Sequence, residues 1–107
     1  MYFLKKTVTI SAAHNLVSPY EGQCKKIHGH NWKITVYCRS HSLNDKGMII
    51  DFVEIKKIVN QLDHSFINEI IKQPTAENMA KWIVDNISTC YRTDVEETEG
   101  SVASYEL

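Results

Sequence analysis

One short run, CKKIHGH at residues 24–30, brings together side chains that bind metals and transfer protons. His28 and His30 are separated by a single residue, and Cys24 lies just ahead of them. Imidazole nitrogens are common ligands of zinc and related ions, while a cysteine thiolate is a nucleophile and a proton carrier. The chemistry that these groups support depends on the elements that position them.

Alternation of apolar and polar residues predicts two strands, over residues 2–14 and 28–39, with a loop between them over residues 15–27. Successive side chains on a strand point to opposite faces. His28 and His30 therefore share the face that carries the apolar residues of the second strand. His14 ends the first strand on its apolar face.

An antiparallel pairing of these strands places the end of the first beside the start of the second, so that three imidazoles converge. Three neutral nitrogens at about 2.0–2.1 Å, with one position left open, describe a catalytic zinc site. The pattern predicts such a site from His14, His28 and His30, with Cys24 near it but not a ligand. Two surface imidazoles without a metal are the alternative for an H-x-H pair.

Polar residues further along the chain are weaker candidates. Asp63 directly precedes His64, and a carboxylate beside an imidazole can orient it for proton transfer. The local pattern alone favours a simpler interpretation, a polar helix end. Glu97 alternates with Val95 and so points inward, where it would need a donor. A solvated carboxylate on a strand at the sheet edge is the alternative for Glu97.

Two helices are predicted between the strand pairs. The first is capped by Asp51 and the second by Thr75, with Glu77 in its first turn, where the helix dipole favours a carboxylate. The apolar residues expected on their buried faces are Ile55, Ile58, Val59 and Leu62 in the first helix, and Met79, Trp82, Ile83 and Ile87 in the second.

Three shorter segments complete the predicted order. Met48–Ile50 is expected to be the end of a strand, and Cys90 is expected to end the second helix. Strands are then predicted over Asp94–Thr98 and Ser101–Glu106. The order ββααββ predicts an α+β fold with an antiparallel sheet, formed as a single domain over residues 1–107.

Composition narrows the class of protein. Of the 107 residues, 43% are apolar and the net charge is −1, which argues against nucleic-acid or anionic-membrane binding. No apolar run approaches the roughly 20 residues that cross a bilayer. Three cysteines without paired spacing fit a reducing compartment, so a cytoplasmic location is expected. Cys38 and Cys90 look inert, and His41 is interpreted as a loop residue without a role in the site.

Six motifs, ISAAH, CKKIHGH, IIDF, LDHSFIN, PTAEN and VEET, occur in an order that resembles the 6-pyruvoyl-tetrahydropterin synthase family. The likeness runs over residues 3–105 and is strongest to the bacterial 6-carboxy-5,6,7,8-tetrahydropterin synthase branch, which serves queuosine synthesis. It implies the tunnelling fold (T-fold), a four-stranded antiparallel sheet with two helices on one face. It also implies a homohexamer of two trimers, with active sites between subunits.

The resemblance also implies roles for particular residues. Zinc would be bound by His14, His28 and His30; Cys24 would transfer protons with help from Asp63 and His64; and Glu97 would anchor the pterin, with Thr75 and Glu77 nearby. The implied reaction converts 7,8-dihydroneopterin triphosphate to 6-carboxy-5,6,7,8-tetrahydropterin, releasing acetaldehyde and triphosphate. Pyruvoyl synthase activity on the same substrate and a non-catalytic zinc or pterin binder are the alternatives. A Cys–His hydrolase is less favoured, because no oxyanion-hole element is evident.

Overall fold

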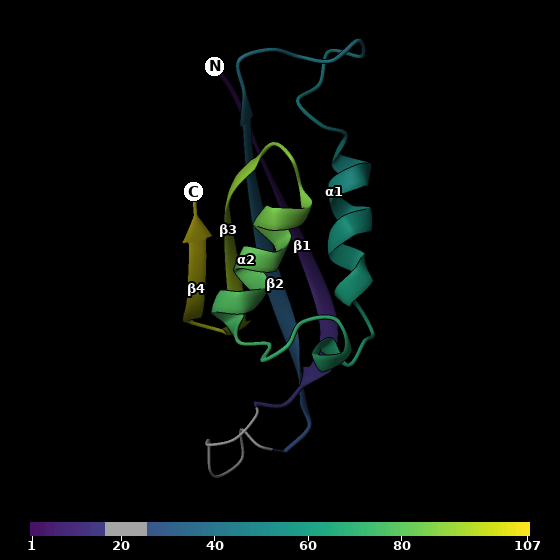
Figure 1. Cartoon of the computed structure of the whole chain (residues 1–107), viewed down its shortest axis with the longest axis vertical. Helices are drawn as coiled ribbons and strands as arrows, with labels where there is room; N and C mark the ends of the chain where they lie inside the picture. Colours follow the sequence, from purple (N-terminus) through teal and green to yellow (C-terminus); the bar gives the residue numbers. More distant parts are fainter. Residues whose placement is uncertain (17–25) are drawn as a thin grey trace.

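The structure is a computed structural model that describes residues 1–16 and 26–107. Its elements confirm the predicted order and add two short 3-10 helices between the α-helices (Figure 1). In chain order the elements are β1 (Tyr2–His14), β2 (His28–Ser40), α1 (Phe52–Val59), η2 (Asn60–Leu62), η3 (Ile67–Glu69), α2 (Ala76–Asn86), β3 (Cys90–Thr98) and β4 (Ser101–Glu106).

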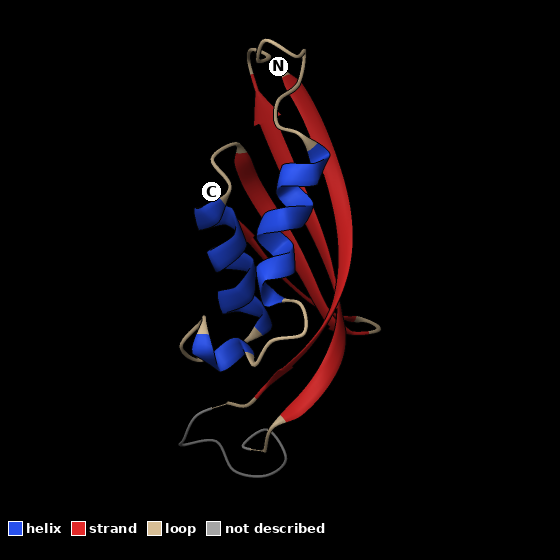
Figure 2. Cartoon of the chain, turned by 90° about the vertical axis from the view of Figure 1, so that its right-hand side faces the viewer, coloured by secondary structure: helices blue, strands red, loops and turns tan. Residues whose placement is uncertain are grey.

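The four strands form one antiparallel sheet in the order β1-β2-β3-β4. Both helices lie on the same face of this curved sheet, as Figure 2 shows. Helix α1 contacts β1, whereas α2 contacts β3 and β4. The predicted two-layer α+β architecture is therefore confirmed, with its apolar core between the sheet and the helices.

The register in which strands β1 and β2 pair determines where the core residues and the histidines lie. Ile10 lies opposite Trp32, and four residues later His14 lies opposite His28. Because the side-chain period is two, the core residues and the histidines share one face. The largest fully buried side chains are those of Trp32, Ile10, Ile34, Ile55, Leu62, Ile67, Met79, Ile83 and Ile87.

Both predicted helix caps are present. Asp51 Oδ1 accepts a hydrogen bond of 2.9 Å from the Val53 amide, and Thr75 Oγ1 accepts one of 3.1 Å from the Asn78 amide. Each bond satisfies an amide that the first helical turn leaves without a partner. Leu62 is buried as predicted, but it lies in the 3-10 turn η2 beyond the end of α1.

Two local predictions were wrong, and two core residues are less buried than expected. Met48–Ile50 is not a strand, because the Met48 backbone bonds to Asn44: Met48 N–H donates to Asn44 Oδ1, and Met48 O accepts from Asn44 N–H. Cys90 begins β3 instead of ending a helix, since the long partner strand β2 pairs with it through Cys38. Ile58 and Trp82, both expected on buried helix faces, are only partly buried and pack against the core.

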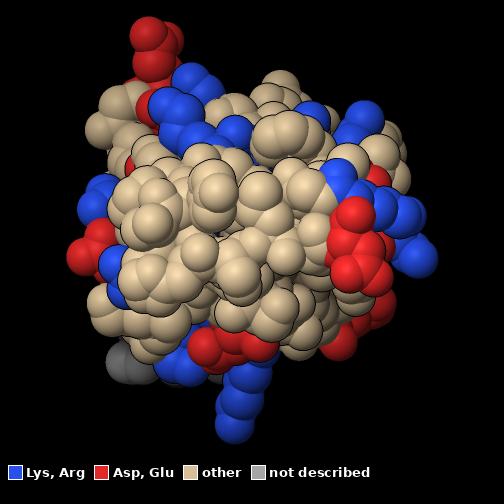
Figure 3. All heavy atoms as spheres, turned by 90° about the horizontal axis from the view of Figure 1, so that it is seen from above, with Lys and Arg blue, Asp and Glu red and all other residues tan. Residues whose placement is uncertain are grey.

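Charged side chains of both signs surround an uncharged centre on the end of the molecule seen in Figure 3. Exposed apolar residues line a groove of about 400 Å³ that includes Tyr2, Phe3, Leu43, Met48 and Phe52. An exposed apolar patch of this kind is typical of a protein–protein contact. Among the described residues, no helix has the length and apolar composition needed to span a bilayer.

On the helix-free face of the sheet, Asp94 is the centre of a polar network across three strands. Its carboxylate accepts hydrogen bonds from Tyr37 Oη at 2.9 Å, Arg92 Nε at 2.9 Å and Ser104 Oγ at 2.6 Å. Burial by itself raises the pKa of Asp94, but the three donors outweigh it and hold the pKa below its ordinary value. A depressed pKa means that the network stabilises the fold above the unfolded-state pKa and loses that contribution as pH falls through the folded-state pKa.

Replacing Asp94 with asparagine weakens this network and is therefore expected to lower the free energy of unfolding at neutral pH. The expected loss is only about 1 kcal/mol, because Arg92 is partly exposed and solvent screens its pairing with Asp94. The difference in free energy of unfolding between the two proteins should shrink below about pH 4, because protonation of Asp94 then removes its charge in the wild type. Urea unfolding at pH 7 and at pH 3 measures both values. Asp85→Asn is the matched control: it removes an exposed pair with Lys81 and should change stability by less than about 0.5 kcal/mol.

Candidate metal centre

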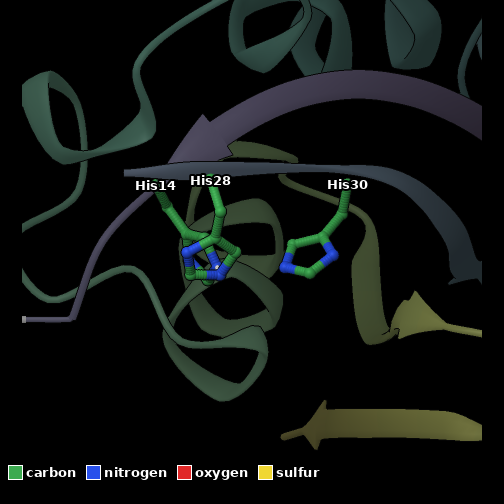
Figure 4. A group of neighbouring side chains, drawn as sticks. All are labelled: His14, His28 and His30. Carbon is green, nitrogen blue, oxygen red and sulfur yellow. Dashed lines mark hydrogen bonds between the residues drawn. The ribbon is translucent and has the colours of Figure 1, made fainter. Parts of the chain in front are cut away.

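Three histidines from the paired ends of β1 and β2 meet at the edge of the core. Their metal-binding atoms all lie within 4.8 Å of one another. In Figure 4 the rings of His14, His28 and His30 hang from the same side of the two strands. The predicted convergence of the three imidazoles is therefore confirmed.

Backbone carbonyls fix the orientation of two of these rings. His14 Nδ1 lies 2.7 Å from the carbonyl oxygen of Pro74, and His28 Nδ1 lies 2.7 Å from that of Lys26. A carbonyl oxygen can only accept, so each Nδ1 carries the proton. In the neutral rings both Nε2 atoms are then unprotonated. This carbonyl-to-imidazole arrangement is the usual outer support of a metal-bound histidine.

The two Nε2 atoms of His14 and His28 face each other at 3.0 Å. Two unprotonated nitrogens at this distance direct lone pairs at each other, which is unfavourable unless a cation lies between them. Burial lowers the pKa of His14, and the neighbouring His28 lowers it further, which opposes a proton as that cation. The arrangement fits a divalent metal ion.

His30 supplies the third nitrogen. Its Nε2 is buried and, among the described residues, has no hydrogen-bond partner. Burial also lowers the pKa of His30, so the ring is neutral and able to donate its lone pair at neutral pH. Buried polar atoms are normally hydrogen-bonded, so a buried Nε2 without such a bond, beside two convergent Nε2 atoms, fits a third metal-ligating nitrogen. Three imidazoles, with no thiolate beside them among residues 1–16 and 26–107, fit zinc with an open coordination position.

Trp32 and Glu97 border the cluster. Trp32 packs edge-to-face on His14 and His30, with ring centroids 4.9 and 5.0 Å apart, and donates its indole N–H to the Ala12 carbonyl. Glu97 lies where the register of β3 and β4 shifts, and its Oε1 is 3.4 Å from His14 Nε2 and 3.5 Å from His30 Nε2. The inward orientation expected for Glu97 is therefore confirmed, while its role toward a pterin stays a prediction.

Asp63 and His64 form a pair, but not in the three-histidine cluster. Asp63 Oδ2 lies 3.0 Å from His64 Nδ1, and its Oδ1 accepts from the Ser11 amide at 2.9 Å. The Ser11 amide and the His64 side chain hold the pKa of Asp63 below its ordinary value. The His64 side chain is 83% exposed, its backbone has φ of 53°, and its amide donates to the Ser11 carbonyl of β1.

The remaining predicted site residues are Thr75 and Glu77 at the start of α2, and Cys24. Thr75 caps α2 through its hydroxyl, and Glu77 is exposed in the first turn of the same helix. Cys24 lies outside the described residues. The supporting carbonyls of Pro74 and Lys26 were not predicted, because a main-chain acceptor has no residue-type signal.

A curved antiparallel sheet that carries three convergent histidines, with both helices on one face, defines a T-fold protein with a candidate zinc centre. Residues 3–107 match the 6-pyruvoyl tetrahydropterin synthase family, and the chain belongs to this family. The chain is 32% identical to the 6-carboxy-5,6,7,8-tetrahydropterin synthase of Bacillus subtilis, over 95% of this chain and 83% of that protein. It is 31% identical to the enzyme of the same name from Synechocystis, over 98% and 93% of the two chains.

The fold agrees with solved structures of the family. The 6-pyruvoyl tetrahydropterin synthase of Caenorhabditis elegans superimposes with a TM-score of 0.77 over 99% of this chain and 95% of that one. The two sequences are 23% identical, so the likeness concerns the fold. The predicted family and the T-fold are thus both confirmed.

Proposed function

We propose that this protein is a zinc-dependent lyase that converts 7,8-dihydroneopterin triphosphate to 6-carboxy-5,6,7,8-tetrahydropterin, with release of acetaldehyde and triphosphate, in queuosine and related deazapurine synthesis. The observation that carries the proposal is the set of three Nε2 atoms, two of them face to face at 3.0 Å and the third with no hydrogen-bond partner in the part of the chain that the structure describes. The names of the Bacillus and Synechocystis relatives favour the carboxy product.

His14, His28 and His30 would hold the zinc ion, and His14 and His28 are oriented for this by carbonyl acceptors. A zinc ion there supplies Lewis acidity to a substrate hydroxyl oxygen and so acidifies the adjacent C–H and O–H bonds. The buried neighbours of the cluster, Trp32 above all, keep the rings in place and exclude water from one side. Glu97 borders the same space, and its carboxylate is proposed to accept hydrogen bonds from the pterin ring.

Cys24 is proposed to be the proton-transfer residue. It stands two residues before Lys26 in the sequence, and the Lys26 carbonyl accepts from Nδ1 of the proposed ligand His28. A thiolate is the active form of cysteine and needs a cationic environment, since a free thiol has a pKa of about 8.5. Asp63 holds the Nδ1 side of His64, which leaves its Nε2 free to exchange a proton.

The exposed position of His64 supports active sites shared between subunits. Its side chain is 83% exposed and is not part of the three-histidine cluster of its own chain. The sheet has two edge strands, β1 and β4, and the unpaired edge of a strand can pair with another sheet. At Ser11 and Ala13 the outer edge of β1 already bonds to residues 63–65, so such pairing would use β4 or the rest of β1. Pairing around a closed ring gives point-group symmetry, and the apolar groove at one end adds a second contact surface. We therefore propose a homohexamer of two trimers.

The substrate is a small pterin triphosphate, with no role for nucleic acid or membrane. A cytoplasmic location is proposed, because Cys38 and Cys90 are free thiols although they face each other on paired strands.

The direct test is to incubate the zinc-loaded protein with 7,8-dihydroneopterin triphosphate and identify the products. Formation of 6-carboxytetrahydropterin together with acetaldehyde is the expected result, because only the carboxy branch cleaves the side chain. A pterin that keeps its three-carbon side chain would assign pyruvoyl synthase activity instead. Binding of zinc and pterin without any product would assign a non-catalytic binder.

A further inference from the structure

The orientation of His14 depends on a segment far from it in the sequence. Its Nδ1 donates to the carbonyl of Pro74, which lies between η3 and α2. His14 is 1% exposed, and this bond is what assigns its proton to Nδ1 and leaves Nε2 for a ligand. The position of the Pro74 carbonyl therefore controls whether His14 presents its lone pair to the cluster.

The residue before Pro74 has an unfavourable backbone. Gln73 has φ of 56°, in the left-handed region, which costs a residue with a side chain about 1–2 kcal/mol. A residue that precedes proline is also sterically restricted, because the proline ring crowds its backbone. Such a conformation persists only where surrounding contacts hold it.

Asn78 supplies that contact. Its Nδ2 donates to the Gln73 carbonyl at 2.9 Å, and the same oxygen accepts from the Thr75 amide at 2.9 Å. The Asn78 backbone amide donates to the Thr75 hydroxyl that caps α2. Asn78 thus fastens the Gln73–Pro74 peptide to the first turn of the helix, while Pro74 presents its own carbonyl to His14.

We propose that Asn78 is a positioning residue for the metal centre. Its side-chain amide holds the left-handed turn at Gln73, so that the Pro74 carbonyl keeps the His14 proton on Nδ1 and aims Nε2 at the other two imidazoles. The proposal rests on the proposed zinc site, but it assigns a role to a residue that does not contact the metal. Asn78 would act through Pro74 and His14 alone.

Asn78→Asp tests this proposal with a change of nearly the same size. The carboxylate cannot donate to the Gln73 carbonyl, yet an acidic residue in the first turn of α2 is favoured by the helix dipole, so the helix itself is not weakened. Zinc affinity, measured by competition with a chelator of known affinity, is expected to fall roughly tenfold, the lower end of the effect of outer-shell changes. Asn78→Ala, which adds no charge, is expected to show the same loss.

The matched control is Asn86→Asp in the same helix. Asn86 Nδ2 also donates to a main-chain oxygen, that of Trp82 at 2.7 Å, but at the far end from Pro74. This variant is expected to bind zinc as wild type does. Unchanged zinc affinity in both Asn78 variants, compared with Asn86→Asp, would refute the proposal.

A second measurement separates this inference from the zinc assignment. In the metal-free protein, nitrogen NMR of the histidine rings reports whether His14 carries its proton on Nδ1. The Asn78 variants are expected to lose the single Nδ1-protonated state, and its retention would refute the role of Asn78 even in a protein that binds no zinc. Failure of the wild type to bind zinc would instead refute the proposed function.

Discussion

Replacing His28 with alanine is expected to abolish stoichiometric zinc binding and, with it, turnover. The substitution removes one of the two Nε2 atoms that face each other at 3.0 Å. Loss of a ligand nitrogen should lower zinc affinity by more than the roughly 10–100-fold that outer-shell changes cost. Zinc content after dialysis, measured by mass spectrometry of the metal, gives the result directly.

The stabilisation of the folded protein by zinc is an independent test of the same variant. Wild-type protein is expected to gain about 4 kcal/mol from zinc at a free concentration 1,000 times the dissociation constant, because the ion binds only the folded state. His28→Ala should lose this gain. The metal-free variant should be no less stable than metal-free wild type, because the facing lone pairs are gone.

His41→Ala is the control for His28→Ala. His41 is exposed, follows the end of β2 and is not part of the three-histidine cluster. The His41→Ala protein should still bind zinc, and added zinc should still raise its unfolding temperature. A His28→Ala protein that retains one tightly bound zinc per chain would contradict the proposed ligand set.

Replacing Cys24 with alanine is expected to reduce kcat by about 10²–10⁴-fold while zinc content stays at the wild-type level. The variant removes the group that moves protons and leaves the three imidazoles in place. The limb of the wild-type pH–rate profile that reports ionisation of the thiol should disappear at the same time. Loss of zinc together with activity would mean that Cys24 is a ligand.

Mixing subunits tests where the proton-transfer group acts. Cys24→Ala and His64→Ala homo-oligomers are each expected to be nearly inactive. If one subunit supplies Cys24 and its neighbour supplies His64, random exchange restores both residues in roughly a quarter of the sites. Activity should therefore reappear on mixing. Absence of recovery, with subunit exchange verified by tagged chains, would place the whole site within one chain.

The fold was predictable because the strands have a clear period of two and the helices have clear caps. Alternation in residues 2–14 and 28–39 assigned the faces, and the antiparallel pairing expected of these two strands is the one observed. The errors have two causes: local turn chemistry that the alternation does not reveal, and tertiary context that overrides local pattern. Asn44 occupies the Met48 backbone in a turn, and the length of β2 draws Cys90 into the sheet.

The candidate site was predictable only in its side chains. Convergence of the histidines followed from strand period and antiparallel pairing alone, without any knowledge of the turn between the strands. The carbonyls of Pro74 and Lys26 could not be predicted, because any residue type carries such an acceptor. Asn78 was hidden for a related reason: its amide acts on a backbone conformation, that of Gln73, which the sequence does not mark.

X-ray absorption at the zinc edge tests the central claim most directly. Zinc-loaded protein is expected to contain one ion per chain, with three imidazole nitrogens at about 2.0–2.1 Å, the multiple-scattering pattern of histidine rings, and a lighter oxygen ligand in the fourth position. A sulfur ligand at about 2.3 Å in place of an imidazole, or a protein that retains no zinc, would contradict it.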